Sequence, residues 1–455
     1  MTNGREQWSS KFGFILAAAG SAVGLGNIWK FPHMAGENGG GAFTLIYLIC
    51  ILVVGLPILL AEFTLGRRTQ ASPVGAFSAL SDGSRWKWLG MLGVASAFVI
   101  LSFYGVIGGW TIKYSLLALA GSFSDIASSA GGAQAEFDQF VANPVEPIFW
   151  HMIFMGLTVL IILKGVKGGI EKWSKALMPI LLGILIVLVI RGVTLDGAME
   201  GIRFLFSPKW GDLTTEGVVL ALGHSFFTIS LGMGTMITYG SYLRKDQDLL
   251  RAGLWVIFID TAIALLAGVA IFTAVFALGQ NPAGGPGLIF VVLPTIFPQM
   301  PGGAVFGFLF FALLFVAALT SAISILEVVI AYFIDEKQWS RTQATLAFGG
   351  IITMLGIFVS LSFGEYNVLK SFGEMNFFSL MDNMSSKYML PIGGFLTAVF
   401  VLTRWGVPEF LKELQTGAAG MKIPLIPAIA VFGFAGLVVA YILLYEVFKV
   451  MFGAG

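Results

Sequence analysis

Two apolar stretches of this chain carry glycines and oxygen-bearing side chains where a membrane helix would ordinarily continue unbroken. The first, residues 12–32, contains Gly24-Leu25-Gly26. The second, residues 218–234, passes from apolar residues to two hydroxyls and two glycines between Thr228 and Gly234. A mid-helix glycine costs about 1 kcal/mol relative to alanine, so both stretches are predicted to unwind there. Backbone freed inside a bilayer is tolerated only where it lines a protein cavity, so the breaks indicate a binding site for a polar or charged ligand.

The composition predicts an all-α integral membrane protein. Of the 455 residues, 57% are hydrophobic and 11% are charged, whereas a soluble domain carries roughly 25% charged residues. The mean hydropathy is +0.89. Apolar runs of about 20 residues, each long enough to cross a bilayer, predict eleven transmembrane helices: 12–37, 41–66, 88–120, 147–164, 173–191, 217–242, 252–278, 304–334, 342–361, 374–402 and 424–450.

The order of the predicted spans indicates an internal repeat. Each broken stretch opens a block of five spans, so we expect a transporter core at residues 1–405 with two related halves, about 12–191 and 217–402. Residues 406–455 would add a polar loop and the eleventh helix. Paired glycine-interrupted segments in corresponding halves of a membrane protein are typical of secondary transporters, which bind their cargo at the breaks.

The charges predict orientation and exclude several classes of protein. Lys and Arg gather on one side of the spans, and segments 121–146 and 279–303 contain none, which favours a cytoplasmic N-terminus and an extracytoplasmic C-terminus in the plasma membrane. A net charge of +1 gives no case for nucleic-acid binding, and nothing implies an obligate protein partner. We see no catalytic constellation of an enzyme and no filter motif of a channel.

Six motifs follow one another along the chain: Arg5–Trp8, Gly20–Pro32, Glu37–Gly41, Ser225–Gly234, Tyr239–Asp246 and Ala317–Ser321. In this order they resemble the neurotransmitter:sodium symporter family. The similarity runs from Arg5 to about Trp405, and the eleven-span length resembles the bacterial amino-acid carriers of that family. This resemblance implies an inverted-repeat fold with helices 1 and 6 unwound, and sodium-coupled uptake of an amino acid.

The resemblance also implies two sodium sites. Sodium is a hard cation that takes oxygen ligands. The first ion is expected at the Ala22 carbonyl, Asn27, Thr228 and Asp260, completed by the carboxylate of the substrate. The second is expected at the carbonyls of Gly20, Val23 and Ala317 and the hydroxyls of Thr320 and Ser321. Thr and Ser often serve only as packing groups between membrane helices, but beside the broken first span we favour sodium for this pair.

The substrate site is expected between the same breaks. The N–H groups of Leu25 and Gly26 begin the second half of the first span, and a helix N-terminus attracts an anion such as a substrate carboxylate. The Tyr104 hydroxyl would be a further donor, and Ser230 would accept from the substrate ammonium. The other residues implied at the pocket are Ala22, Gly24, Ile100, Phe227, Thr228, Met233, Ser321 and Ile325.

Gly24 narrows the substrate class. Family members that carry monoamines resemble this chain but have an aspartate there, which supplies the carboxylate that their substrates lack. With Gly24 the substrate must bring its own carboxylate, so an amino acid fits and a monoamine does not. The resemblance and a pocket without charged residues imply a hydrophobic or aromatic L-amino acid. A sodium-coupled carrier of another small zwitterion, glycine-like or betaine-like, is the alternative.

Asp260 departs from the pattern of chloride-dependent relatives, which have asparagine there and bind chloride close by. Its fixed negative charge predicts chloride independence. A carboxylate left buried without its cation is costly, so we expect it to bind a proton once sodium leaves, which amounts to proton counter-transport.

The resemblance places gates at both ends of the pathway. The inner gate is expected at Arg5 and Asp335, helped by Trp8, Ser241, Tyr242 and Glu327. At the outer gate Lys30 and Asn376 replace the family's arginine–aspartate pair, so closure would depend more on Tyr104 and Phe227. We also predict that Glu62 braces the broken helices and that Asp382 pairs with Lys387.

Overall fold

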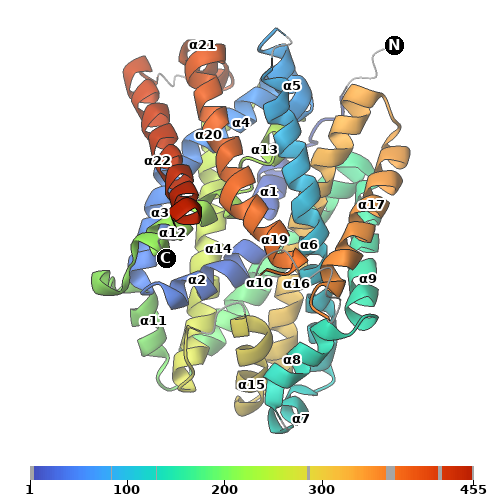
Figure 1. Cartoon of the computed structure of the whole chain (residues 1–455), viewed down its shortest axis with the longest axis vertical. Helices are drawn as coiled ribbons and strands as arrows, with labels where there is room; N and C mark the ends of the chain where they lie inside the picture. The colour runs from blue at the N-terminus through green and yellow to red at the C-terminus, as the bar shows by residue number, and fades with distance from the viewer. Residues whose placement is uncertain are drawn as a thin grey trace.

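The computed structural model describes residues 5–82, 85–129, 131–283, 287–364, 375–418 and 423–452. Most of these residues are helical, and the long helices run roughly along one axis (Figure 1). Within this part of the chain the extended pairing is limited to a single bridge between Gly40 and Pro208. The first residue of the predicted tenth span and part of the loop before the last helix fall outside the described residues.

The spans follow the predicted order closely. Eight helical spans are long and apolar enough to cross a bilayer, or up to ten if each of two bent pairs counts as one span. Two shorter helices, α12 and α13, lie at the sixth predicted span, so each of the eleven predicted spans contains helix in the part of the chain that the structure describes. Their bounds are α1 (Lys11–Ala22) with Gly26–Lys30 and α2 (Phe31–Glu37), α3 (Gly41–Cys50) with α4 (Leu56–Thr69), α6 (Lys87–Leu119), α9 (Glu146–Ile162), Val166–Glu171 with α10 (Lys172–Val193), α12 (Thr215–Thr228) with α13 (Thr235–Gly240), α14 (Leu249–Ala277), α16 (Gly303–Lys337), α17 (Arg341–Leu361), α19 (Phe377–Asn383) with α20 (Leu390–Phe400), and α22 (Leu425–Phe452).

Shorter helices lie between the spans. On the side of the N-terminus, α5 (Pro73–Ala79) and α21 (Val407–Gln415) connect spans. At the opposite end, loops contain α7 (Phe123–Ser128), α8 (Gly132–Ala142), α11 (Ala198–Phe206) and α15 (Leu293–Ile296) (Figure 1).

The first span breaks where its glycines predict. Helix α1 ends at Ala22, Val23 is extended with φ −72° and ψ 103°, and a π-helical turn begins at Gly26. The two parts of the span meet at an angle of 47°. Asn27 and Ile28 then donate their N–H groups to the Gly24 carbonyl at 3.2 and 3.4 Å. The carbonyls just before the break are thereby left free for other partners.

The second break depends on left-handed backbone. Between α12 and α13, Gly232 and Gly234 both have φ near +77°, and Ser230 has φ +55°. Glycine adopts such angles without steric cost, whereas other residues do so rarely. The position of Gly232 also requires the absence of a side chain, because a Cβ there would overlap the Leu390 carbonyl.

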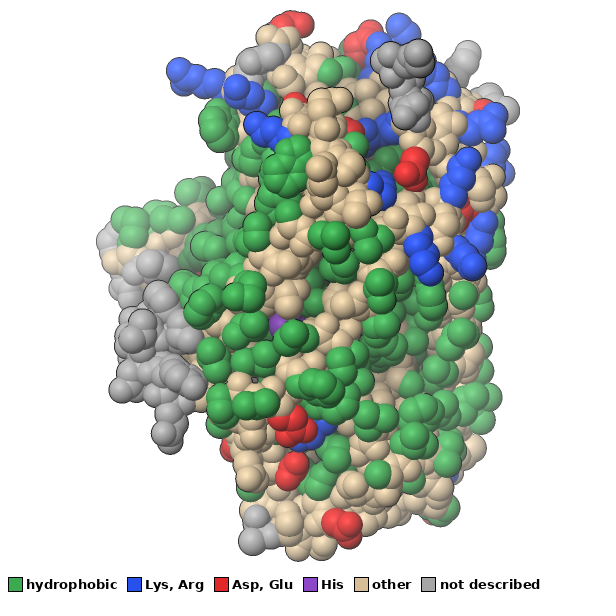
Figure 2. Space-filling view, turned by 90° about the vertical axis from the view of Figure 1, so that its right-hand side faces the viewer, with side chains coloured by type: hydrophobic (Ala, Val, Ile, Leu, Met, Phe, Trp, Pro, Cys, Tyr) green, Lys and Arg blue, Asp and Glu red, His purple; other side chains and the backbone are tan. Residues whose placement is uncertain are grey.

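The two breaks meet inside the bundle. The Ser230 hydroxyl donates to the Ser21 carbonyl at 3.0 Å, so the second break is tied directly to the end of α1. The surface around them is apolar along the middle of the molecule, and Lys and Arg gather at one end (Figure 2). An apolar band with basic residues at one end is the distribution that a membrane-spanning bundle requires.

Candidate functional site

The residues predicted for the first sodium site converge on Asp260. Asn27 Nδ2 donates to Asp260 Oδ1 at 2.8 Å and to the Asp260 carbonyl at 3.0 Å. Thr228 donates its hydroxyl to the same Oδ1 at 3.1 Å. All three side chains are buried, and Ala22 lies at the end of α1 beside them. This cluster is thus built from α14, from the residues after the first break and from the end of α12, and its buried carboxylate has only neutral donors among the partners described.

The residues predicted for the second sodium site also lie together. Ser321 Oγ is 3.4 Å from the Val23 carbonyl, and Thr320 Oγ1 is 3.0 Å from the Ala317 carbonyl. A Cβ built on Gly20 would be 3.5 Å from Thr320 Cβ, so α1 and α16 approach closely there. Both hydroxyls donate to carbonyls, and a hydroxyl oxygen also carries lone pairs of the kind that a hard cation takes as ligands.

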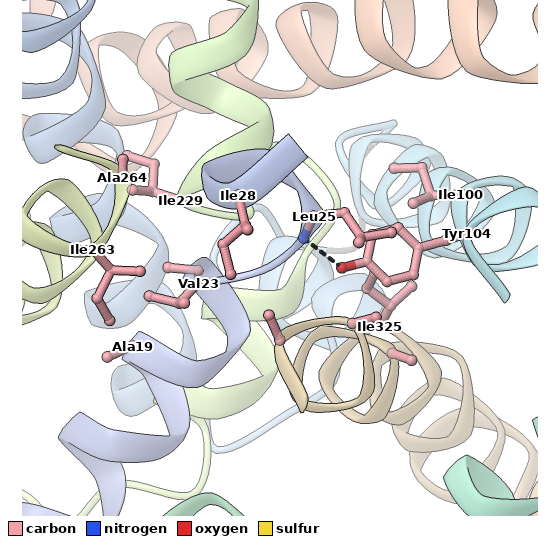
Figure 3. Packing of buried hydrophobic residues seen from close by; sticks show 14 of the residues in the cluster. Ala19, Val23, Leu25, Ile28, Ile100, Tyr104, Ile229, Ile263, Ala264 and Ile325 are labelled. Carbon is pink, nitrogen blue, oxygen red and sulfur yellow. Dashed lines mark hydrogen bonds between the residues drawn. The ribbon is translucent and has the colours of Figure 1, made fainter. Parts of the chain in front are cut away.

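Several of the residues predicted for the substrate lie around Leu25 at the first break. Tyr104, on α6, accepts a hydrogen bond from the Leu25 N–H at 3.1 Å. Figure 3 shows Ile100, Tyr104 and Ile325 around Leu25, while Val23, Ile28 and Ile263 lie on the other side of the chain. Phe227 faces the break from α12, because a Cβ on Gly26 would be 3.3 Å from its ring. Met233 is buried beside Gly93 of α6.

Gly24 is enclosed by polar atoms. A Cβ there would be 2.7 Å from the Tyr104 hydroxyl and would overlap the Ser321 hydroxyl. No side chain fits at this position without moving both of them. A side chain at position 24, a carboxylate included, would therefore have to displace Tyr104 and Ser321.

Sequence reasoning missed Ser21 and Ser324, which join the breaks to α16. Ser21 Oγ donates to Ser324 Oγ at 2.7 Å and is 3.2 Å from Ser230 Oγ. The Ser21 carbonyl accepts from both Ser230 and Ser321. Ser21 lies within the Gly20–Pro32 motif, but a serine in a run of small residues gives no signal of its own.

Glu62 braces the second break, as predicted. Its Oε1 accepts a hydrogen bond from the Gly232 N–H at 2.8 Å, and its side chain is fully buried. An acid on α4 thus satisfies backbone that would otherwise be unpaired within the bundle.

The residues predicted for the inner gate lie close together. Arg5 is paired with Asp335 at 2.6 Å, and its guanidinium also donates to Ser241 at 2.8 and 3.0 Å. Trp8 is buried and donates from Nε1 to the Tyr239 carbonyl at 3.0 Å. Tyr242 donates to Glu327 at 2.6 Å.

Glu327 has a further partner that sequence reasoning did not assign. Arg341, the first residue of α17, donates to both of its carboxylate oxygens at 2.8 and 2.9 Å. A bidentate arginine–carboxylate pair is the strongest geometry of this kind.

The prediction for the outer charges is wrong. Lys30 pairs with Asp382 at 2.6 Å, not with a neutral partner, and Asp382 is thus engaged by Lys30 instead of by Lys387. Asn376 is the N-cap of α19, and its Oδ1 accepts from the Ser379 N–H at 2.8 Å. The side chain of Asn376 therefore caps its own helix. The negative charge that pairs with Lys30 comes from Asp382, near the end of α19. Lys30 Nζ also lies 4.2 Å from the centre of the Phe227 ring.

A cavity of about 170 Å³ adjoins this outer pair, and Lys30, Phe227 and Asp382 are among the residues that line it. Phe227 contacts the first break on one side and this cavity on the other. The Phe227 ring therefore lies between the first break and this cavity.

Comparison with known proteins agrees with this geometry. A model of the sodium:neurotransmitter symporter family matches residues 5–126 and 140–452. This chain belongs to that family. A solved structure of MhsT, the multihydrophobic amino acid transporter, in complex with L-phenylalanine is 48% identical, with a TM-score of 0.89, and the match covers 97% of this chain and 99% of that one.

Curated bacterial relatives give the same assignment. The uncharacterised sodium-dependent transporter YhdH of Bacillus subtilis is 42% identical over 416 residues, 91% of this chain and 92% of the relative. An uncharacterised sodium-dependent transporter of Haemophilus influenzae is 37% identical over 87% of this chain and 89% of its own length. The chain is therefore a sodium-dependent symporter and a membrane transporter, not an enzyme.

Proposed function

We propose that this symporter imports hydrophobic or aromatic L-amino acids with two sodium ions. The observation that carries the substrate class is the enclosed Gly24, which leaves no room for a protein carboxylate beside Tyr104 and Ser321. The carboxylate must then come from the substrate, where the Leu25 N–H and the Tyr104 hydroxyl can bind it. Ile100, Met233 and Ile325 offer an apolar lining to its side chain.

The two ions are assigned to the oxygen clusters described above. The first would be bound by Ala22, Asn27, Thr228 and Asp260, and the second by Gly20, Val23, Ala317, Thr320 and Ser321. Each cluster joins the first break to an unbroken helix, α14 or α16. Sodium would thus favour one arrangement of the breaks, in which the substrate site is complete.

Asp260 makes the transport cycle independent of chloride and coupled to protons. The carboxylate balances sodium while the ion is bound. When sodium leaves, a proton on this carboxylate would replace the cation, because an unpaired charge in the bundle is costly. The empty carrier would return outward with the proton, with the N-terminus in the cytoplasm as the distribution of basic residues favours.

Uptake into proteoliposomes tests the proposal. A sodium gradient should drive accumulation of labelled leucine and tryptophan, and unlabelled phenylalanine should compete with both. Glutamate and lysine should not compete, since none of the residues assigned to the substrate pocket carries a charge. Counterflow of glycine in preference to leucine and tryptophan would instead support the small-zwitterion alternative.

A further inference from the structure

A groove of about 280 Å³ lies between the start of α6 and the side of α20. The start of α6 follows α5, so the groove lies at the end of the molecule where Lys and Arg gather (Figure 1, Figure 2). In a bilayer this is the level at which the apolar band of the protein gives way to the lipid headgroups. The groove is lined by two tryptophans, three leucines and one arginine: Trp86, Trp88, Leu89, Leu92, Leu396 and Arg85.

The floor of the groove is apolar and firmly packed. Leu89 is buried in a small cluster that includes Phe400. The ring of Trp86 packs edge-on against Phe400, with 5.1 Å between the ring centres. Leu92 and Leu396 pack against the same cluster but are only partly buried. Because apolar cavities in proteins stay dry and bind apolar molecules, this floor suits a hydrocarbon chain better than water.

Two basic side chains lie beside this apolar floor. Arg85 and Lys87 are both exposed, and Lys87 Nζ lies 6.0 Å from the centre of the Trp88 ring. The acid that precedes them in the sequence, Asp82, is paired with Arg404 at 2.7 Å. Within the part of the chain that the structure describes, neither Arg85 nor Lys87 has a carboxylate as its partner. The groove therefore combines an apolar floor with two positive charges that the protein leaves unbalanced.

We propose that this groove binds an anionic phospholipid from the surrounding leaflet. The lipid phosphate would lie at Arg85 and Lys87, and an acyl chain would lie along Leu89, Leu92 and Leu396. A free anion would use only the charges and a neutral lipid only the leucines, whereas an anionic phospholipid complements both. Tryptophans such as Trp88, which is 64% exposed, are typical of this level of the membrane. The site is independent of the cargo that the carrier transports.

Quenching of tryptophan fluorescence by phospholipids with brominated acyl chains tests the site in the full chain. The protein is reconstituted in phosphatidylcholine vesicles that contain a rising fraction of brominated phosphatidylglycerol or, in parallel, of brominated phosphatidylcholine. Each protein is compared with its Trp88→Phe counterpart, so that the difference in quenching reports lipid at Trp88. This difference should reach half its maximum at about a 25-fold lower fraction of phosphatidylglycerol than of phosphatidylcholine, about fivefold for each basic residue.

Single variants separate the two charges from the general basic surface. Arg85→Gln and Lys87→Gln should each lower the preference for phosphatidylglycerol about fivefold. Lys412→Gln removes a largely exposed basic residue on α21 and serves as the matched control, which should keep the full preference. The same loss of preference in all three variants would show attraction to a basic surface without a site and would overturn the proposal.

The decisive variant is Leu396→Phe, which narrows the groove and leaves both charges in place. It should lower the quenching at Trp88 by phosphatidylglycerol, because the acyl chain loses its space. Unchanged quenching in this variant would overturn the proposal, as would equal half-saturation of the wild type by the two lipids. Free glycerol phosphate should not compete, since it has no acyl chain. Competition by glycerol phosphate at millimolar concentration would instead show a site for the phosphate group alone and would likewise overturn the proposal.

Discussion

Asn27 is the residue that connects the first break to α14. Its Oδ1 accepts from the Gly24 N–H at 3.0 Å while its Nδ2 donates twice to Asp260. Hydrogen bonds to charged groups are worth about 1.5–3 kcal/mol. Asn27→Ala removes both connections and one oxygen ligand. We expect sodium-dependent binding of labelled leucine to require about 10- to 100-fold more sodium.

A sodium titration of purified protein checks this expectation. Asn143→Ala, in an exposed loop where the side chain caps backbone N–H groups, is the matched control and should titrate like the wild type. Wild-type sodium dependence in Asn27→Ala would remove the first sodium site from this position.

Asp260 permits a sharper experiment because its charge can be removed without changing its shape. In Asp260→Asn an anion would be needed to balance sodium, so chloride should stimulate uptake. The wild type should transport equally in chloride and in gluconate. Acidifying the vesicle interior should speed wild-type uptake, since protonation allows the empty carrier to return, and the variant should lose this response.

The control for this prediction is Asp138→Asn, in the loop helix α8. Uptake is measured in proteoliposomes at fixed sodium gradient, with internal pH and anion varied separately. Chloride-dependent transport by the wild type would refute the role assigned to Asp260.

At the scale of single elements, Lys30 and Asp382 join α19 to the second half of the broken first span. The pair is partly exposed, with side chains 10% and 28% accessible. Its lysine also lies over the Phe227 ring, so the pair holds the ring in position. Reversing one charge brings like charges together and should slow exchange of labelled substrate across the membrane.

Lys30→Asp and Asp382→Lys should therefore each slow counterflow about tenfold, and the double variant should recover most of the rate. Asn376→Ala removes only the cap of α19, so combining it with Lys30→Asp should not restore the counterflow rate. If the double charge reversal were as slow as either single variant, the pair would not be an outer gate.

These elements also show which features a sequence can predict. Hydropathy predicts the spans because each bilayer crossing needs a long apolar run. The glycines predict both breaks because glycine, which has no side chain, is unfavourable within a helix. The partner of Lys30 was not predictable, because it depends on Asn376 capping α19 and on where Asp382 then lies. The same is true of Ser21 and Ser324, whose hydroxyls meet only through the rotation of two packed helices.

At the scale of the whole molecule, several connected charges lie at the end that we predict to be cytoplasmic. Arg5–Asp335 and Arg341–Glu327 lie there with Trp8 and Tyr242 between them. Loss of one pair should raise the share of inward-open molecules without touching the ion sites. The apparent affinity for sodium falls in proportion to the share of molecules that can still bind it.

Arg5→Ala should therefore raise the sodium concentration needed for half-maximal leucine binding about fivefold, as expected for loss of a partly buried, hydrogen-bonded ion pair. Asp335→Asn should do the same, and the double variant should add little, since both changes remove one shared contact. Arg404→Ala, which breaks an exposed pair with Asp82 at 2.7 Å, is the control and should have no effect. Equal sodium dependence in the wild type, the two single variants and the double variant would mean that the Arg5–Asp335 pair does not set the share of inward-open molecules. Fully additive losses would mean instead that each residue acts through a separate contact.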